Sequence, residues 1–247
     1  MKTGFWIAMI GTALALSGCG KGDGGSANGA QPAGSVAAVA APKGTTWEDT
    51  VAATPAGGFV RGNPDAPLKL VEYASFTCPH CKEFAETADE GLRTAVNTGK
   101  VSFEFRNFVR DPLDITASLL ARCGGKDPFF PLAHQMFGNQ EAMFKAIQGA
   151  GEAGYQNAMK LPPNQRFGKL AELAGLIEFV KARGIAEPQA RACLADFAEA
   201  EKLAKANDAA VKEFAIEGTP TLILNGEKLE NANTWPALQT VLKDRGA

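Results

Sequence analysis

Two cysteines separated by two residues are the most reactive arrangement in this sequence. Cys78-Pro79-His80-Cys81 follows an apolar stretch and lies where a helix should begin, and Pro79 suits a first helical turn. The unpaired N–H groups and the positive dipole end of a helix stabilise a thiolate. The motif therefore predicts a redox-active disulfide, with Cys78 as the nucleophile and Cys81, one turn into the helix, as the resolving thiol.

His80 can bring a positive charge or an N–H donor to the Cys78 sulfur and so lower the pKa of that thiol. Because a stabilised thiolate stabilises the reduced form, the disulfide becomes a stronger oxidant. Zinc binding is one alternative, but zinc needs further ligands and His134 is the only other histidine. A purely structural disulfide between Cys78 and Cys81 is a second alternative. Disulfide exchange needs no cofactor, and we expect neither a metal nor any other cofactor.

The elements around the motif are predicted to form a strand, a helix and a second strand. Leu68–Tyr73 has the apolar content of a mostly buried strand and follows the turn-prone segment Gly62–Pro67. The helix is predicted to continue to about Asn97, and Val101–Arg106 alternates apolar and polar residues as a strand does. The motif thus lies between the first strand and the helix of a βαβ unit.

From Pro112 to about Asp196 the apolar residues recur at helical spacing, which predicts an all-helical insertion. Gly149–Gln165, with its Gly and Pro-Pro content, is predicted to be a loop inside it. His134 and the aromatic residues at helical spacing around it are predicted to form the core of the insertion: Phe129, Phe130, Phe137 and Phe144.

The last part of the chain is predicted to return to the first domain. Phe197–Ile216 is rich in Ala, Glu and Lys, which favours a long helix. Thr221–Leu224 is an apolar strand, and Asn225-Gly226 predicts a hairpin turn into a short partner strand near Lys228. A final helix is expected from Thr234 to about Asp244.

Residues 1–18 have the composition of a secretory signal peptide. Phe5–Leu16 is apolar but shorter than the roughly 20 residues that span a bilayer, and no later segment is longer, so no permanent transmembrane helix is expected. Leu16-Ser17-Gly18-Cys19 resembles the lipobox of bacterial lipoproteins, in which the cysteine is lipidated and becomes the new N-terminus. An ordinary signal peptide cut near Ala27 or Ala30 is the alternative.

Gly, Ala and Ser dominate the residues that follow Cys19, which predicts a flexible linker over 19–46 with a reach of roughly 30 Å. The formal net charge of −2 is spread along 247 residues without long runs of one sign. This pattern gives no basic patch for nucleic acid, and nucleic-acid binding is not expected.

Two segments of the sequence resemble the active site of DsbA-like thiol-disulfide oxidoreductases. Glu72-Tyr-Ala-Ser-Phe-Thr-Cys-Pro-His-Cys81 is similar to their catalytic segment, and Gly218-Thr219-Pro220 is similar to their cis-proline loop. The resemblance implies an α/β, thioredoxin-like fold with an all-helical domain inserted. The thioredoxin-like part would comprise residues 47–110 and 198–247, and the insertion residues 111–197.

The resemblance also implies roles for individual residues. Pro220 would be cis beside the Cys78 disulfide, leaving the backbone of Thr219 to pair with an extended substrate; an ordinary trans proline is the alternative. Glu72 would be a buried carboxylate that assists proton transfer from Cys81, unless it is a surface charge at the strand edge. A second acidic position of the relatives is Ala85 here.

A structural disulfide between Cys123 and Cys193, at opposite ends of the insertion, occurs in some DsbA-like proteins and is expected here. With Cys19 lipidated and the catalytic pair formed, this bond would account for all five cysteines. Two buried free thiols are the alternative.

We expect a DsbA-like oxidase of the periplasm, anchored to a bacterial membrane as a lipoprotein. The resemblance implies reduced exported proteins as clients and a DsbB-like membrane quinone reductase as redox partner. Dimeric isomerases of the family add an N-terminal dimerisation domain, whereas residues 1–46 here are signal and linker, so a monomer is expected. Two alternatives stay open: a reductase or isomerase of selected clients, and a non-catalytic module that holds extended peptides.

Overall fold

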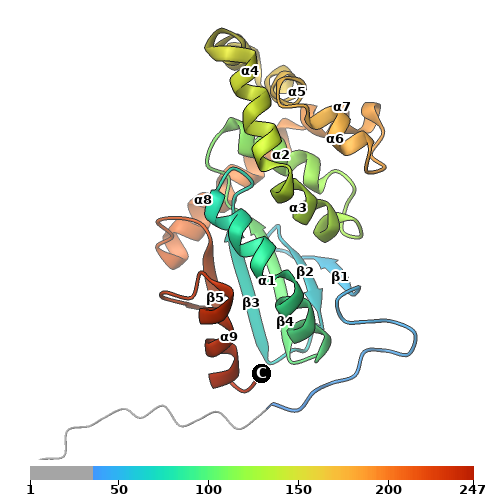
Figure 1. The fold of residues 1–247 in the computed structure, drawn as a ribbon, viewed down its shortest axis with the longest axis vertical. Helices are drawn as coiled ribbons and strands as arrows, with labels where there is room; N and C mark the ends of the chain where they lie inside the picture. Colours follow the sequence, from blue (N-terminus) through green and yellow to red (C-terminus); the bar gives the residue numbers. More distant parts are fainter. Residues whose placement is uncertain (1–35) are drawn as a thin grey trace, which may run out of the picture. The chain divides into compact units, whose positions relative to one another are not determined.

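A mixed β-sheet is the framework of the structure, a computed structural model that describes residues 36–247. The predicted signal peptide, Cys19 and residues up to 35 lie outside the described part. The strands are β1 (Val51–Ala53), β2 (Phe59–Gly62), β3 (Leu68–Ala74), β4 (Val101–Asn107), β5 (Thr221–Leu224) and β6 (Glu227–Lys228). Their order across the sheet is β1-β2-β4-β3-β5-β6 (Figure 1).

The helices fall into three groups along the chain. The first and the last pack on the sheet, and the remainder lie between β4 and β5 (Figure 1). They are α1 (Pro79–Asn97), α2 (Pro112–Arg122), α3 (Phe129–Gly138), α4 (Gln140–Met159), α5 (Pro163–Leu173), α6 (Leu176–Lys181), α7 (Glu187–Ala195), α8 (Phe197–Phe214) and α9 (Trp235–Asp244).

Strand β3 is central, because it pairs in parallel with β4 and antiparallel with β5. Side chains alternate between the two faces of a strand, so neighbouring residues of β3 meet different helices. Tyr73 packs against Phe214 of α8 on one face, and Glu72 lies with Phe84 of α1 around a cavity on the other. The βαβ unit predicted from the sequence is confirmed, and it places the cysteine motif after the carboxyl end of β3.

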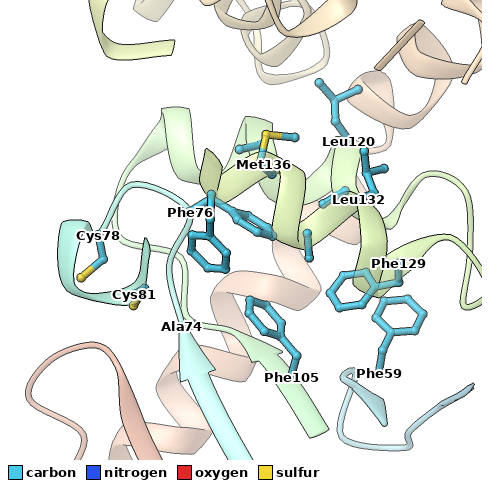
Figure 2. Packing of buried hydrophobic residues seen from close by; sticks show 14 of the residues in the cluster. Phe59, Ala74, Phe76, Cys78, Cys81, Phe105, Leu120, Phe129, Leu132 and Met136 are labelled. Atoms are coloured by element: carbon cyan, nitrogen blue, oxygen red, sulfur yellow. The ribbon is translucent and has the colours of Figure 1, made fainter. Parts of the chain in front are cut away.

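A row of aromatic side chains connects the motif to the helices of the insertion. Figure 2 shows this row from Cys78 and Cys81 through Phe76 toward Phe129. Phe76 is fully buried, with its ring centroid 5.7 Å from that of Phe105 and 4.9 Å from that of Phe137. Because interiors are close-packed, a shift of α3 would be transmitted to the residues that precede the nucleophile.

Two predictions about the insertion are wrong. The segment Gly149–Gln165 is mostly helical, because α4 continues to Met159 and only Gly151 leaves helical geometry, with φ of 69° and ψ of 169°. Glycine tolerates this positive φ, so the helix bends there and resumes, and the surrounding Ala, Glu and Gln residues favour helix. His134 is exposed instead of buried, whereas Phe129 and Phe137 on the same helix are in the core.

The predicted linker also ends earlier than expected, since residues 36–46 lie along the domain. The backbone N–H of Val36 donates to the carbonyl of Gly246, and that of Val39 donates to the carbonyl of Thr98. The indole N–H of the buried Trp47 donates to the carbonyl of Val39 at 2.7 Å. These bonds fix the segment, although its composition alone suggests a free tether.

Cys123, which follows α2, and Cys193 of α7 form a disulfide, which confirms the expected pairing. The two residues are 70 positions apart in the chain and their Cα atoms are 5.8 Å apart. Closing a loop of that length stabilises the fold by about 4 kcal/mol in the chain-entropy model.

Among the helices of residues 36–247, none is both long and apolar enough to cross a bilayer.

Gly91 of α1 generates a stability prediction, because a Cβ atom there would lie 2.0 Å from Cζ2 of Trp235 in α9. Replacing a helical glycine by alanine normally stabilises by up to about 1 kcal/mol. Here we expect Gly91→Ala to destabilise by about 1–3 kcal/mol, since the rigid indole must move. Urea unfolding measures the difference.

Gly168→Ala in α5 is the matched control, because nothing lies within 4 Å of a Cβ at that position. We expect this control to be neutral or stabilised by up to about 1 kcal/mol. Equal effects of the two substitutions would contradict the proposed close contact between α1 and α9.

Candidate active site

The cysteine motif occupies the first turn of α1. Cys78 is the N-cap residue, with φ of −92° and ψ of 120°, and Pro79 follows in the first turn, where a missing N–H costs nothing. Both thiols are free in this structure, and both residues are buried. The helix therefore presents its unpaired N–H groups to the sulfur of Cys78, as the sequence predicted.

The surroundings of Cys78 lower the pKa of its thiol to about 4. The largest cause is hydrogen bonding from the Cys81 thiol, followed by Thr219 and by the backbone N–H groups of Cys81 and His80, which together outweigh burial. In the thiol form, Cys78 donates to the carbonyl of Thr219 over 3.2 Å. Cys78 is thus a thiolate at neutral pH and the more reactive of the two cysteines.

His80 contributes differently from the prediction. Its side chain is 78% exposed, and Nδ1 lies 3.8 Å from a carboxylate oxygen of Glu83. The contact of this residue with the Cys78 sulfur comes from the backbone N–H. The position of the residue in the first helical turn therefore stabilises the thiolate, whereas the imidazole points toward α1 and solvent.

Cys81 has the opposite environment. Burial is the main cause that raises the pKa of its thiol far above the ordinary value, and the hydrogen bond with Cys78 and the charge of Glu72 add to it. Of the two sulfurs, Cys81 is therefore the one that holds a proton in the reduced protein. This asymmetry matches the predicted division between nucleophile and resolving thiol.

The loop before β5 faces the motif. The bond between Thr219 and Pro220 is cis, as the resemblance implies, and Pro220 is buried. The hydroxyl of Thr219 is buried and has no other partner among residues 36–247, and it acts on the sulfur of Cys78. Strands β3 and β5 are paired, with Tyr73 opposite Thr221. This pairing brings the loop that precedes β5 beside the motif.

Glu72 is buried beneath the motif, with 3% of its surface exposed, so the interpretation as a surface charge is wrong. Burial raises the pKa of its carboxyl to about 8, and Oε1 has no hydrogen-bond partner within the described part of the chain. A cavity of about 40 Å³ adjoins Glu72 and is lined also by Arg61, Ala85, Asp89 and His134. This volume suffices for about two or three water molecules.

Arg61 and Asp89 form the polar side of that cavity, with 3.6 Å between Nη2 and Oδ1. Arg61 is buried and its charge opposes the rise in the pKa of Glu72. Sequence reasoning missed Arg61, because β2 is only four residues long and no pattern marked it. Ala85, where the resemblance implies a second acidic position, also lines the cavity, and Asp89 lies one helical turn further along α1.

Sequence reasoning also missed two residues of the insertion that contact the loop before the motif. The carboxylate of Asp114 accepts from the N–H of Phe76 at 2.8 Å, and the side-chain amide of Gln140 donates to the carbonyls of Phe76 and Cys78. Both residues are buried. Asp111-Pro112 was a detectable helix start, but nothing in the sequence distinguished Gln140.

Comparison with known proteins agrees with this geometry. The thioredoxin family model matches residues 54–244. A protein-disulfide isomerase from Novosphingobium aromaticivorans shares 33% sequence identity, with a TM-score of 0.72 over 75% of this chain and 95% of that one. Alpha-DsbA1 of Wolbachia pipientis has the same fold, with 20% identity and a TM-score of 0.62 over 78% of this chain and 92% of that one.

A Rickettsia bellii protein that bears the name of a protein-disulfide oxidoreductase is 28% identical over 174 residues, which are 70% of this chain and 59% of that protein. The chain thus spans less than two thirds of the length of this relative. The match of the family model and the similarity to the Novosphingobium structure cover most of the chain. The chain therefore belongs to the thioredoxin family and has the DsbA-like form of its fold, with helices inserted between β4 and β5.

Proposed function

We propose that this protein is a thiol-disulfide oxidoreductase that donates the Cys78–Cys81 disulfide to client proteins. The observation that carries the proposal is the contrast between the two sulfurs, because the fold stabilises a thiolate on Cys78 and a protonated thiol on Cys81. A stabilised thiolate favours the reduced form of the motif, and so makes its disulfide oxidising.

The exchange proceeds in two balanced steps. A client thiolate attacks the sulfur of Cys78, the Cys78–Cys81 bond breaks, and Cys81 leaves as a thiolate that takes up a proton. A second client thiolate then attacks the client sulfur of the mixed disulfide and releases Cys78 as the thiolate. The client gains one disulfide and the motif gains two electrons. The carbonyl of Thr219, beside Cys78, is placed to accept a backbone hydrogen bond from an extended client.

Glu72 is the proton donor of this scheme. With a pKa of about 8, its carboxyl holds a proton at neutral pH, and it is close enough for its charge to act on the Cys81 thiol. It can protonate the leaving Cys81 thiolate and recover a proton through water in the adjoining cavity. In the reverse direction the carboxylate would accept the proton from Cys81.

One observation favours the opposite direction of electron flow, from this protein to its clients. The solved structure with 33% identity is named a protein-disulfide isomerase, and the same site can reduce or rearrange client disulfides if its potential is low.

The clients that we propose are exported proteins, with a DsbB-like membrane quinone reductase to restore the disulfide of an oxidase. A monomer anchored in the periplasm through lipidated Cys19 would reach such clients.

The reduction potential of the Cys78–Cys81 pair distinguishes the two directions. We expect a value more oxidising than about −150 mV after equilibration with glutathione, because the reduced form is stabilised. A value near about −250 mV would show that the protein gives electrons to its clients. The same titration of a Cys123→Ala, Cys193→Ala double variant is the control, since it removes the other disulfide from the measurement.

Substituting Glu72→Gln tests the proton donor. We expect slower formation of the mixed disulfide by roughly 10- to 100-fold, because the amide cannot protonate the leaving Cys81 thiolate. Rapid-mixing fluorescence or acid-quenched thiol alkylation follows the rates. Glu90→Gln, an exposed position of α1, is the control and should leave them unchanged.

The pH dependence of stability gives Glu72→Gln a second readout. Between the ordinary pKa of 4.5 and the folded value of about 8, the folded wild type holds a proton that the unfolded chain has lost, so its stability falls as pH rises. Glu72→Gln has no carboxyl at this position, so it does not lose stability in this way as pH rises. Its stability relative to wild type should therefore increase with pH across that window in urea unfolding, and a constant difference would contradict a buried, protonated carboxyl.

The proposed anchor is tested on Cys19, which lies outside the described residues. We expect the full chain, expressed in a lipoprotein-processing bacterium, to incorporate labelled fatty acid and to partition into detergent. Cys19→Ser should remain unlabelled and partition into water, whereas Ser26→Ala, in the same linker, should behave as wild type. Export of the unaltered chain without any lipid would contradict the anchor and leave the redox proposal intact.

A further inference from the structure

The loop Ser75–Cys78 joins β3 to α1 and carries the nucleophile at its end. Its four residues are buried, with exposed fractions between 0% and 7%. A buried loop must satisfy its backbone groups within the protein. The partners of this loop come largely from the inserted helices, which are remote from it in sequence.

Gln140, the first residue of α4, is 4% exposed and points its amide at the loop. Its Nε2 donates to the carbonyl of Phe76 at 2.9 Å and to the carbonyl of Cys78 at 3.0 Å. The two N–H groups of one side-chain amide thus connect the carbonyl of Phe76 with the carbonyl of the nucleophile, Cys78. A side chain without these donors would leave the carbonyl of Phe76 buried with its hydrogen bond lost.

Asp114 and Asp111, at the start of α2, hold the same loop from its other side. Asp114 is fully buried, and its two oxygens accept from the N–H of Phe76 at 2.8 Å and from that of Arg110 at 3.0 Å. The hydroxyl of Thr77 donates to Asp111 at 2.8 Å. The insertion therefore holds Phe76 by both its N–H and its C=O groups.

We propose that the inserted helices position Cys78 through Gln140 and Asp114, and that this positioning determines how strongly the site stabilises the Cys78 thiolate. The sulfur of Cys78 receives its hydrogen bonds from groups on α1 and from the side chain of Thr219. Hydrogen bonds weaken steeply with distance and angle, so a small shift of the loop backbone loses part of that stabilisation. Gln140 and Asp114 bond to backbone groups of the loop, so they act on the sulfur through the backbone.

This inference deepens the proposed function and concerns the same site. Gln140→Met is the direct test, because methionine has a similar length and volume but no donor. We expect the pKa of Cys78, followed by thiolate absorbance against pH, to rise by about one unit. The equilibrium constant with glutathione should change about tenfold toward a less oxidising disulfide, which corresponds to about 30 mV.

Gln156→Met is the matched control, an exposed glutamine of the same helix whose amide bonds only to Glu152. It should leave the pKa and the equilibrium constant of the motif unchanged. Asp114→Asn should shift both quantities in the same direction as Gln140→Met, since an amide in place of the carboxylate can accept at only one of its two positions. A lower melting temperature of Gln140→Met with unchanged thiol pKa and equilibrium constant would overturn the proposal.

A measurement on the wild-type protein covers the case in which Gln140→Met does not fold. The side-chain amide resonances of Gln140 should shift in NMR spectra when the motif is reduced, and should titrate with the midpoint of the Cys78 thiol. Amide resonances that follow neither change would overturn the proposal. A wild-type equilibrium constant with glutathione that marks a reducing pair would contradict the oxidase function alone, because the difference between Gln140→Met and wild type would persist.

Discussion

The Cys78 thiolate depends on hydrogen-bond donors that only the folded chain brings together. Cys81 and the first turn of α1 supply most of them, and the side chain of Thr219 reaches the same sulfur from the loop before β5. The parallel pair of β3 and β4 places the start of α1 at the carboxyl end of β3, while the pairing of β3 with β5 brings Thr219 to that same end. The order of the strands is therefore a requirement of the chemistry as much as of stability.

Beneath the motif the structure keeps two buried acids, Glu72 and Asp114, at a cost in solvation. Burial raises the pKa of both carboxyls, to about 8 and about 7. A carboxyl whose pKa is raised by folding makes the folded state less stable as pH rises. Such carboxyls cluster at functional sites, where the chemistry uses their shifted pKa. Their contacts differ, since Glu72 adjoins a cavity with one oxygen unpartnered, whereas Asp114 bonds to backbone N–H groups. One is suited to exchange a proton and the other to hold a loop.

The sequence was sufficient for the parts of the fold that local patterns determine. The strand Thr221–Leu224, the helix from Pro79 to Asn97 and the hairpin at Asn225-Gly226 agree with the structure, because periodicity, a proline at the first turn and turn chemistry act locally. Strands β1 and β2 were missed, since each is at most four residues long. Gln140 and Arg61 could not be found, because their roles arise from contacts between elements distant in the chain.

The docked segment after residue 35 determines where a tether from the proposed anchor would join the domain. Val36 and Val39 bond at the chain terminus and at the residue that follows α1, which is the end of that helix opposite Cys78. A helix of 19 residues is about 28 Å long. With Cys19 lipidated as proposed, the chain would leave the domain at the end distal to the motif. Cys78 would then lie at the opposite end of α1 from the point where the tether joins the domain, so the described segment 36–46 does not cover the side from which a client reaches the nucleophile.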